Sequence, residues 1–358
     1  MILKAGIAEF LALALECPVL DVRSPGEYAH AHIPGAYSLP LFSDEERKVV
    51  GTAYKQQSRE VAIKIGLDYF GVKMRHMVEE VEVVNSKFKI QNSKPPDGGS
   101  RVDNRILVHC WRGGMRSAGV AWLLDLYGFK VYTLQGGYKS YRNWVLQQFD
   151  ADYPLHVIGG YTGAGKTEVL KKLAAKGHKT IDLEGIANHK GSAFGGLGAG
   201  AQPTQEMFEN ELAMALYNIA SDGVQQPIWI EDESQRIGSV NLPGAFYNTL
   251  RSAPVHALSV PFEQRLEYLT KEYGKHKKEE LINATVRIQK RLGGQNTKTA
   301  VNYLIEGDYK ESFRILLHYY DKYYEKGLKE RQENAGQVRT IVCDDVDAVA
   351  NYKKLVAE

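Results

Sequence analysis

Short apolar runs alternate with longer amphipathic segments along most of this chain. Residues 18–22, 105–109 and 130–134 are dominated by apolar side chains, and residues 117–127 repeat apolar side chains at helical spacing. Runs of about five apolar residues are typical of buried strands, whereas spacings of three and four residues are typical of a helix. Strand, loop and helix in this order predict a layered α/β domain.

The same alternation resumes after residue 153 and favours a second domain. A helix is predicted around residues 207–221, between apolar runs that indicate parallel strands. The predicted strands are 155–158, 179–182 and 227–230. After Phe262 the chain becomes helical, polar and basic. We therefore expect an α/β domain over residues 1–149 and a parallel α/β domain with a helical C-terminal part over residues 153–358.

Two insertions interrupt the first domain ahead of the run at 105–109. Residues 43–71 are predicted to be helical, opening with Ser43 and Glu46 at capping-box spacing. Residues 92–104 are polar and rich in proline and glycine, which predicts a mobile loop.

The composition narrows the class of protein. With 358 residues, 44% of them apolar and 25% charged, the chain is long enough for about two globular domains. Its net charge is +2, so any nucleic-acid surface must be local. Lys4 and Glu9 interrupt the apolar start, so no signal peptide is expected, and no apolar run reaches the length of a membrane span. Three scattered cysteines form neither a disulfide framework nor a zinc motif, so we expect a cytoplasmic protein without membrane association.

Residues 160–167, Gly-Tyr-Thr-Gly-Ala-Gly-Lys-Thr, match every fixed position of the phosphate-binding pattern G-x-x-x-x-G-K-[ST]. Its glycines let backbone N–H groups turn towards phosphate oxygens, Lys166 neutralises phosphate charge, and Thr167 can hold Mg²⁺. The helix that follows, from about Glu168, directs its positive N-terminus at the same place. The predicted phosphate-binding residues are Gly160, Thr162, Gly163, Gly165, Lys166 and Thr167.

Two further segments near this loop remain open to more than one interpretation. Glu231 and Asp232 follow a predicted strand, where nucleotide enzymes coordinate Mg²⁺, although a solvated acidic turn has the same sequence. Asp182 is a rival for that role. Residues 191–205 contain five glycines and indicate either a lid over the ligand or a plain flexible loop.

Cys110 lies in the segment His-Cys-Trp-Arg-Gly-Gly-Met-Arg-Ser, between a predicted strand and a predicted helix. Gly113 and Gly114 let the backbone wrap so that its N–H groups converge. The charges of Arg112 and Arg116 favour the Cys110 thiolate and an anionic ligand, which makes these three residues the predicted catalytic group. The remaining cysteines, Cys17 and Cys343, have ordinary surroundings and are interpreted as structural.

Residues 271–298 form a local basic segment, with eight Lys or Arg and three Glu, or +5. The candidate nucleic-acid-binding residues in it are Lys275, Lys277, Lys278, Arg287, Lys290 and Arg291. Tyr268 and Tyr273 lie nearby and are of a type that stacks on bases. A solvated helix face is the alternative. Four tyrosines at helical spacing are predicted to belong to the core: Tyr319, Tyr320, Tyr323 and Tyr324.

Residues 20–36, Leu-Asp-Val-Arg-Ser-Pro-Gly-Glu-Tyr-Ala-His-Ala-His-Ile-Pro-Gly-Ala, resemble the opening signature of rhodanese domains. The Cys110 loop also resembles the Cys-x₅-Arg pattern of cysteine phosphatases, including those on a rhodanese-like fold. It is longer than the loop of ordinary thiosulfate sulfurtransferases, which suggests a bulkier anion such as phosphate or selenophosphate.

Nearly the whole chain resembles the tRNA 2-selenouridine synthases, in which a rhodanese-like domain precedes a P-loop domain. The motifs that carry this resemblance, in order, are residues 110–117, 160–167, 188–195 (Asn-His-Lys-Gly-Ser-Ala-Phe-Gly) and 231–238 (Glu-Asp-Glu-Ser-Gln-Arg-Ile-Gly).

The resemblance implies an enzyme that replaces the sulfur of wobble 2-thiouridine in tRNA by selenium from selenophosphate. It also implies prior attachment of a geranyl group from geranyl diphosphate to that sulfur. Cys110 would carry the selenium, and the P-loop would hold a diphosphate rather than ATP. The expected partners are tRNA and an enzyme that supplies selenophosphate; we expect a monomer with no tightly bound cofactor, apart from any Mg²⁺.

Three other functions fit parts of the pattern. A cysteine phosphatase fused to a nucleotide-binding domain would use Cys110 and Arg116, but it needs a general acid that the sequence does not reveal. A non-enzymatic sensor would keep its output when Cys110 is replaced. A small-molecule kinase would turn over ATP without tRNA.

Overall fold

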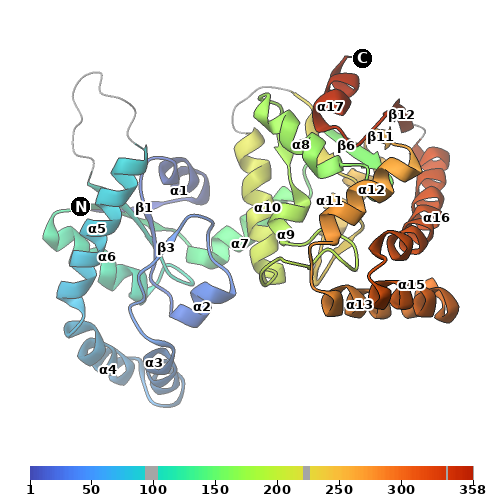
Figure 1. The fold of residues 1–358 in the computed structure, drawn as a ribbon. Coiled ribbons are helices and arrows are strands. Elements are labelled where there is room, and N and C mark those ends of the chain that lie inside the picture. The colour runs from blue at the N-terminus through green and yellow to red at the C-terminus, as the bar shows by residue number, and fades with distance from the viewer. Residues whose placement is uncertain (93–103, 221–225, 336–337, 358) are drawn as a thin grey trace. The chain divides into compact units, whose positions relative to one another are not determined.

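The computed structural model describes residues 1–92, 104–220, 226–335 and 338–357 (Figure 1). The chain forms two compact units, Met1–Gln147 and Gln148–Glu358. The loop expected at residues 92–104 falls almost entirely outside the described residues. No helix in the described part of the chain has both the length and the apolar content to cross a membrane.

A five-stranded parallel sheet forms the centre of the first unit, in the order β1-β5-β4-β2-β3. The strands are β1 (Ile2–Ala5), β2 (Val19–Asp21), β3 (Tyr37–Ser38), β4 (Arg105–His109) and β5 (Lys130–Leu134). Asp21 pairs with His109 at the carboxyl ends of β2 and β4. Because parallel strands end at the same edge of a sheet, the segment that follows β4 emerges beside the segment that follows β2.

Helices cover the sheet of the first unit (Figure 1). They are α1 (Ile7–Ala14), α2 (Pro25–His30), α3 (Asp44–Gln56), α4 (Arg59–Gly71), α5 (Met74–Asn92), α6 (Met115–Tyr127) and α7 (Gly137–Gln148). The single helical segment predicted over 43–71 is two helices, because the Ser58 hydroxyl accepts from the Val61 amide at 3.2 Å and starts α4 anew. The predicted capping box of Ser43 and Glu46 is present.

The second unit also has a five-stranded parallel sheet, in the order β12-β11-β6-β8-β7. Its strands are β6 (Leu155–Gly160), β7 (Lys179–Ile181), β8 (Ile228–Glu231), β11 (Val255–Ser259) and β12 (Val338–Val342), and a short antiparallel pair is formed by β9 (Arg236–Ile237) and β10 (Val240–Asn241). The sequence pattern predicted β6, β7 and β8. Strands β11 and β12 were not predicted.

The helices of the second unit form two groups. Those near the sheet are α8 (Lys166–Ala175), α9 (Leu183–Ala187), α10 (Gln205–Ala220), α11 (Gly244–Ser252) and α17 (Ala348–Val356). The C-terminal helical part contains α12 (Phe262–Tyr273), α13 (Lys278–Arg287), α14 (Gln289–Leu292), α15 (Gly294–Glu306) and α16 (Tyr309–Ala335). This part has its own core, built on residues such as Leu266, Leu304 and Leu317. The predicted α/β class with a helical C-terminal part is confirmed for the second unit.

Candidate functional site

Cys110 begins a tight loop between β4 and α6 in the first unit. The residue is buried, and its Sγ lies 3.2 Å from the hydroxyl oxygen of Ser117. That hydroxyl lies 3.1 Å from the Gly114 carbonyl, to which it can donate. A hydroxyl hydrogen rotates to suit its acceptor, so Ser117 can donate to a Cys110 thiolate instead. The sequence placed Ser117 only at the start of a helix; its contact with sulfur appears in the fold.

The turn that follows β5 contains two glycines and packs against the backbone of the cysteine loop. The Tyr138 amide donates to the Cys110 carbonyl at 2.8 Å. Gly137 has a φ of +62°, and a Cβ there would lie 2.4 Å from both the Cys110 carbonyl oxygen and the Gly113 amide nitrogen. Only glycine fits such an approach. This contact was not predicted from the sequence, although two glycines directly after a predicted strand were the available signal.

Arg116, predicted to act on the anion, also has a carboxylate partner. Its Nη1 donates to Glu27 Oε2 at 2.6 Å, and Glu27 contacts Arg47 as well, at 3.1 Å. Burial would raise the pKa of Glu27, but the hydrogen bond and charge of Arg116 outweigh it and lower that pKa to about 2. Arg112 is exposed. The structure therefore places one of the two predicted arginines in an ion pair and the other at the surface.

The Glu27 carboxylate is expected to make stability depend on pH in the acid range. Its pKa is lower in the folded protein than in the unfolded chain, so its stabilising contribution is complete above pH 5 and is lost as pH falls towards 2. The free energies of unfolding of Glu27→Gln and the wild type, measured with denaturant, should therefore differ most near neutral pH and become equal in acid. A difference that stays constant over this range would contradict the assignment.

Three buried polar side chains, those of Asp21, Arg23 and His109, lie at or next to the ends of the strands that precede the cysteine loop. The Arg23 guanidinium donates to Asp21 Oδ2 at 2.6 Å and to the Ala31 carbonyl at 2.7 Å. It also lies over the Tyr138 ring, 3.8 Å from its centroid. Burial lowers the pKa of His109 to about 4, despite the opposing charge of Asp21, so this imidazole is neutral near pH 7. These residues hold the ends of β2 and β4 in position under Cys110.

The P-loop of the second unit has the predicted context, with β6 before it and α8 after it. Gly163 and Gly165 have φ values of +81° and +77°, and a Cβ at Gly163 would lie 2.9 Å from Leu269 Cγ. Lys166 Nζ donates to the Gly160 carbonyl at 2.9 Å. The first amides of α8 have no carbonyl within the helix to bond, so they can bind an anion.

Two carboxyl groups meet at the Thr167 hydroxyl. Its Oγ1 lies 2.6 Å from Glu231 Oε1 and 3.1 Å from Glu184 Oε2. A hydroxyl has one hydrogen and can donate to only one of them at a time, so a proton on one carboxyl group would complete the second bond. Burial, and then the charge of Glu184, raise the pKa of Glu231 to about 8, and burial also raises the pKa of Glu184.

Glu184 was not predicted, and the other acidic candidates have different roles. Asp232 accepts from Arg331 at 2.8 Å, in a pair that is almost fully buried. Asp182 is the N-cap of α9, accepting from the Gly185 amide at 2.7 Å. Burial, followed by the charge of Glu184, raises the pKa of Glu233. Of these five acidic residues, Glu231 and Glu184 are the two that hydrogen-bond to Thr167.

Carboxylate and hydroxyl oxygens of this kind suit hard cations such as Mg²⁺. Within the described ranges, no three acidic, histidine or cysteine side chains are grouped so as to hold a metal ion by themselves. Mg²⁺ usually binds through one or two carboxylates together with substrate phosphates and water. The donor set at Thr167 fits that second kind of site.

Side chains of helices α12 and α16 form hydrogen bonds with the backbone of the P-loop. Arg265 donates to the Thr162 carbonyl at 3.1 Å and forms a two-pronged pair with Asp321 at 2.7 and 2.8 Å. The Tyr324 hydroxyl accepts from the Gly160 amide at 2.5 Å. Tyr324 was predicted to be a core residue, and its polar contact with the loop was not foreseen. Tyr323, predicted in the same way, is exposed, so that prediction is wrong.

Breaking the Arg265–Asp321 pair is expected to destabilise the second unit. The Arg265 guanidinium is only 4% exposed, and Asp321→Ala removes its carboxylate partner. Loss of one partner of a buried ion pair typically lowers the free energy of unfolding by about 3–5 kcal/mol. Urea unfolding should show this loss. Glu263→Gln is the control, because its pair with Arg314 is exposed and its loss should change stability little. Equal effects of the two variants would contradict the assignment.

The glycine-rich segment 191–205 is folded against the helical core. Phe194 is buried among Leu266 and its neighbours, and the Lys190 amide donates to the Gly195 carbonyl at 3.0 Å. A Cβ at Gly191 would lie 2.4 Å from Glu233 Oε2. The segment therefore packs over the acidic residues near the P-loop.

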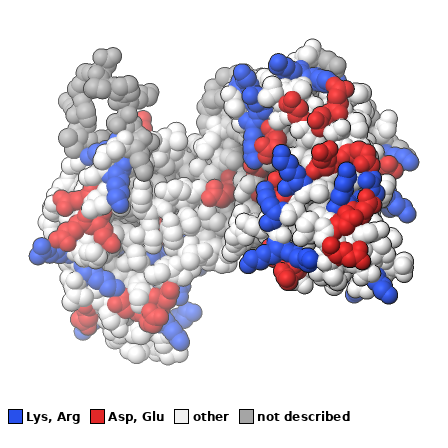
Figure 2. Space-filling model, in the orientation of Figure 1, with Lys and Arg blue, Asp and Glu red and all other residues white. Residues whose placement is uncertain are grey.

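The predicted basic segment lies mostly at the surface. Five of its six candidates are exposed: Lys275, Lys277, Arg287, Lys290 and Arg291. Lys278 is half-buried and donates to the Ile305 carbonyl at 2.8 Å. Figure 2 shows basic and acidic side chains interspersed on the visible face of this unit. Tyr273 packs against Phe194 and Phe313 rather than standing free as a platform for bases.

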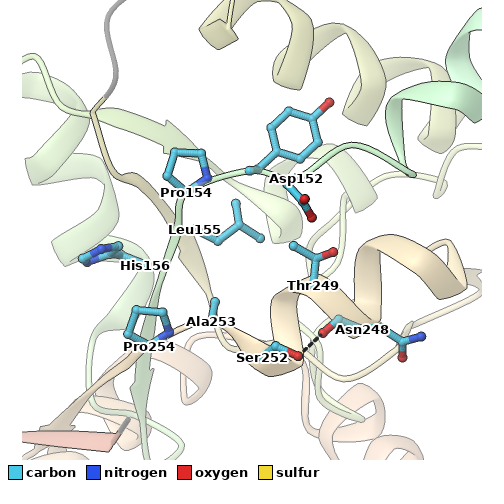
Figure 3. Close-up of a pocket in the computed structure, with 10 residues that line it drawn as sticks. Asp152, Pro154, Leu155, His156, Asn248, Thr249, Ser252, Ala253 and Pro254 are labelled. Atoms are coloured by element: carbon cyan, nitrogen blue, oxygen red, sulfur yellow. Dashed lines mark hydrogen bonds between the residues drawn. The ribbon is translucent and has the colours of Figure 1, made fainter. Parts of the chain in front are cut away.

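A surface pocket of about 530 Å³ lies at the opposite end of β6 from the P-loop (Figure 3). Tyr153, His156, Asn248 and Ser252 are among its lining residues. It adjoins the start of β6, whereas the P-loop follows the end of that strand, roughly 15–20 Å away at the usual rise per residue. This pocket is therefore separate from the P-loop.

Comparison with known proteins agrees with this two-part arrangement. Residues 153–356 match the family model described as the tRNA 2-selenouridine synthase AAA domain, and residues 7–143 match the rhodanese-like domain. The tRNA 2-selenouridine synthase of Sulfurovum sp. (strain NBC37-1) is 35% identical, covering 92% of this chain and 93% of its own length. That of Hydrogenovibrio crunogenus is 34% identical, covering 88% and 90%.

A solved structure of the N-terminal domain of a protein described as ATP/GTP-binding, from Clostridium difficile 630, is 36% identical. It covers 40% of this chain and 98% of its own, with a TM-score of 0.34. The expected resemblance is confirmed by the two family models and by relatives that align over most of this sequence. The chain therefore belongs to the tRNA 2-selenouridine synthase family.

Proposed function

We propose that this protein replaces sulfur by selenium in wobble 2-thiouridine of tRNA, with selenophosphate as the selenium donor and an S-geranylated base as intermediate. Its relatives are named for 2-selenouridine synthesis in tRNA. The observation that supports the finer proposal is the presence of two different anion-binding loops in one chain. One begins with a cysteine, and the other carries the Lys and Thr of a phosphate loop.

The P-loop is proposed to bind the diphosphate of geranyl diphosphate. The sulfur of the base attacks the first geranyl carbon, the carbon–oxygen bond breaks, and diphosphate leaves with the electron pair. Lys166 and the N-terminal amides of α8 stabilise the charge that develops on this leaving group. Mg²⁺, when bound beside Thr167 and Glu231, would add positive charge at the same phosphates.

The Cys110 loop is proposed to catalyse the replacement of sulfur by selenium on the base. Geranylation turns the sulfur into a better leaving group, so that selenium can take its place on the base. The Cys110 thiolate, stabilised by the Ser117 hydroxyl 3.2 Å from its sulfur, attacks C2 of the base, and geranylthiolate leaves with the electrons of the broken carbon–sulfur bond. The selenium of selenophosphate then bonds to C2 as Cys110 leaves, and water cleaves the phosphorus–selenium bond and releases phosphate. The positive charges of Arg112 and Arg116 attract the selenophosphate anion.

The proposed partners are tRNA and an enzyme that supplies selenophosphate, and the proposed working form is a monomer. The tRNA surface is assigned to the exposed residues of the basic segment, Lys275, Lys277, Arg287, Lys290 and Arg291, with Lys278 beside them. Exposed lysine and arginine side chains bind the phosphate backbone without reading sequence.

Nucleoside mass spectrometry of 2-thiouridine tRNA incubated with the wild-type protein tests the proposal. With selenophosphate and geranyl diphosphate together, 2-selenouridine should appear; without selenophosphate, the S-geranylated nucleoside should accumulate. Unchanged 2-thiouridine in all reactions would overturn the proposed function. A burst of phosphate from an aryl phosphate in the same preparation would then favour the cysteine phosphatase.

A further inference from the structure

Trp111 is the exposed aromatic residue that directly follows the proposed nucleophile. Its side chain is 37% exposed, whereas Cys110 is only 3% exposed. Adjacent Cα atoms are about 3.8 Å apart, so the indole stands on the same loop as Cys110, at the carboxyl edge of the sheet. Gly113 and Gly114 follow in the same loop and have no side chains to cover the ring.

The indole of Trp111 packs against a buried aromatic ring. Its ring lies 5.7 Å from the ring of Tyr138 at an interplanar angle of 38°, and Tyr138 is fully buried. The Arg23 guanidinium lies over the Tyr138 ring as well. The Trp111 carbonyl accepts from the Lys139 amide at 3.0 Å, which fixes the backbone. An aromatic ring with this support loses little conformational entropy when it binds a ligand.

We infer that Trp111 is a stacking platform for the 2-thiouridine base and positions its C2 substituent at Cys110; this rests on the proposed function. Bases in single-stranded RNA loops are recognised by stacking on aromatic side chains, and every base presents a π-face. A base in an anticodon loop can leave its neighbours more readily than a base in a duplex. The exposed guanidinium of Arg112, next in sequence, suits the phosphates on either side of such a base.

A nucleobase fits the loop better than a protein partner does. The surface beside Trp111 combines one planar ring with Arg112 and two glycines, a combination that suits a flat ligand flanked by phosphates. Met115, which begins α6, is also exposed. A second tryptophan, Trp122, is also exposed and lies two turns after Met115 on α6. Its neighbours in the sequence are apolar, so it has no adjacent arginine to bind a phosphate.

The test compares Trp111→Leu, Trp111→Phe and the control Trp122→Leu in the full-length chain. The probes are two anticodon stem-loop RNAs, one with 2-thiouridine and the other with uridine at the wobble position. Affinity is measured by titration, and turnover by nucleoside mass spectrometry with selenophosphate and geranyl diphosphate. The rate of Cys110 alkylation, mapped by peptide mass spectrometry, checks that the loop remains intact.

Trp111→Leu should lower affinity for the 2-thiouridine RNA by about tenfold to a hundredfold, the range expected for one stacked base. Trp111→Phe should lose less, because it keeps a ring, and Trp122→Leu should match the wild type. Affinity of Trp111→Leu equal to that of the wild type, or an equal loss in Trp122→Leu, would overturn the inference in favour of a protein-binding face. If the wild type binds the RNA but never converts it, the proposed function fails, and the binding comparison still decides the role of Trp111.

Discussion

Replacing Cys110 with serine should abolish 2-selenouridine formation, leaving less than about a thousandth of the wild-type rate, the scale on which loss of a nucleophile affects enzymes. Serine preserves the hydrogen bond to Ser117 but is far harder to deprotonate, and it is a poorer nucleophile and a poorer leaving group at C2 of the base. Nucleoside mass spectrometry of 2-thiouridine tRNA with both substrates measures the loss. The S-geranylated nucleoside should still form, because the P-loop is unchanged.

Cys343→Ser is the matched control for this variant. Cys343 is equally buried, lies in the other unit, and donates to the Ile341 carbonyl at 3.4 Å, a bond that serine can make. It should retain wild-type conversion. Residual 2-selenouridine in Cys110→Ser at more than a few per cent of the wild-type rate would show that the thiol is not needed, which would favour direct transfer from selenophosphate to the base.

Replacing Lys166 with alanine should weaken geranyl diphosphate binding by roughly a hundredfold or more. The change removes a charge-assisted hydrogen bond, worth about 1.5–3 kcal/mol, together with the full positive charge opposite a multiply charged diphosphate. Calorimetric titration with geranyl diphosphate measures the loss. The rate of Cys110 alkylation should not change, because the thiol belongs to a separate compact unit.

Lys171→Ala controls for the loss of a lysine from the same helix. Lys171 is exposed and pairs with Glu168 at 2.9 Å, one turn along α8 from the P-loop. It should bind geranyl diphosphate as the wild type does. Unchanged affinity in Lys166→Ala would contradict the proposed ligand of the P-loop, and tight binding of ATP by the wild type would then favour a nucleotide-dependent function.

The strands that surround both loops could be predicted because each is a short apolar run bounded by polar residues. Residues 105–109 and 130–134 were predicted as strands and match β4 and β5. The prediction failed where local signals compete. Residues 43–71 have continuous helical character, yet Ser58 caps a new helix in the middle of the segment. Strands β11 and β12 were missed although they flank β6 on one side of the second sheet.

The two loops follow from the sequence alone, because their chemistry depends on consecutive residues. Glycines set the backbone of the P-loop, Lys166 and Thr167 follow at once, and Cys110 has its glycines and arginines within six residues. A local pattern of this kind fixes which groups converge before any distant contact forms.

Only the tertiary structure showed the partners that come from distant parts of the chain. Glu184 meets Thr167 from α9, Glu27 meets Arg116 from α2, and Tyr324 reaches the Gly160 amide across 164 positions. Asp232 looked as suitable as Glu231 in the sequence, yet alternating side chains of an extended segment point in opposite directions. One reaches Thr167, and the other pairs with Arg331. Sequence spacing determines neighbours along the chain, whereas burial and charge pairing between elements decide which of two adjacent carboxyl groups faces the ligand.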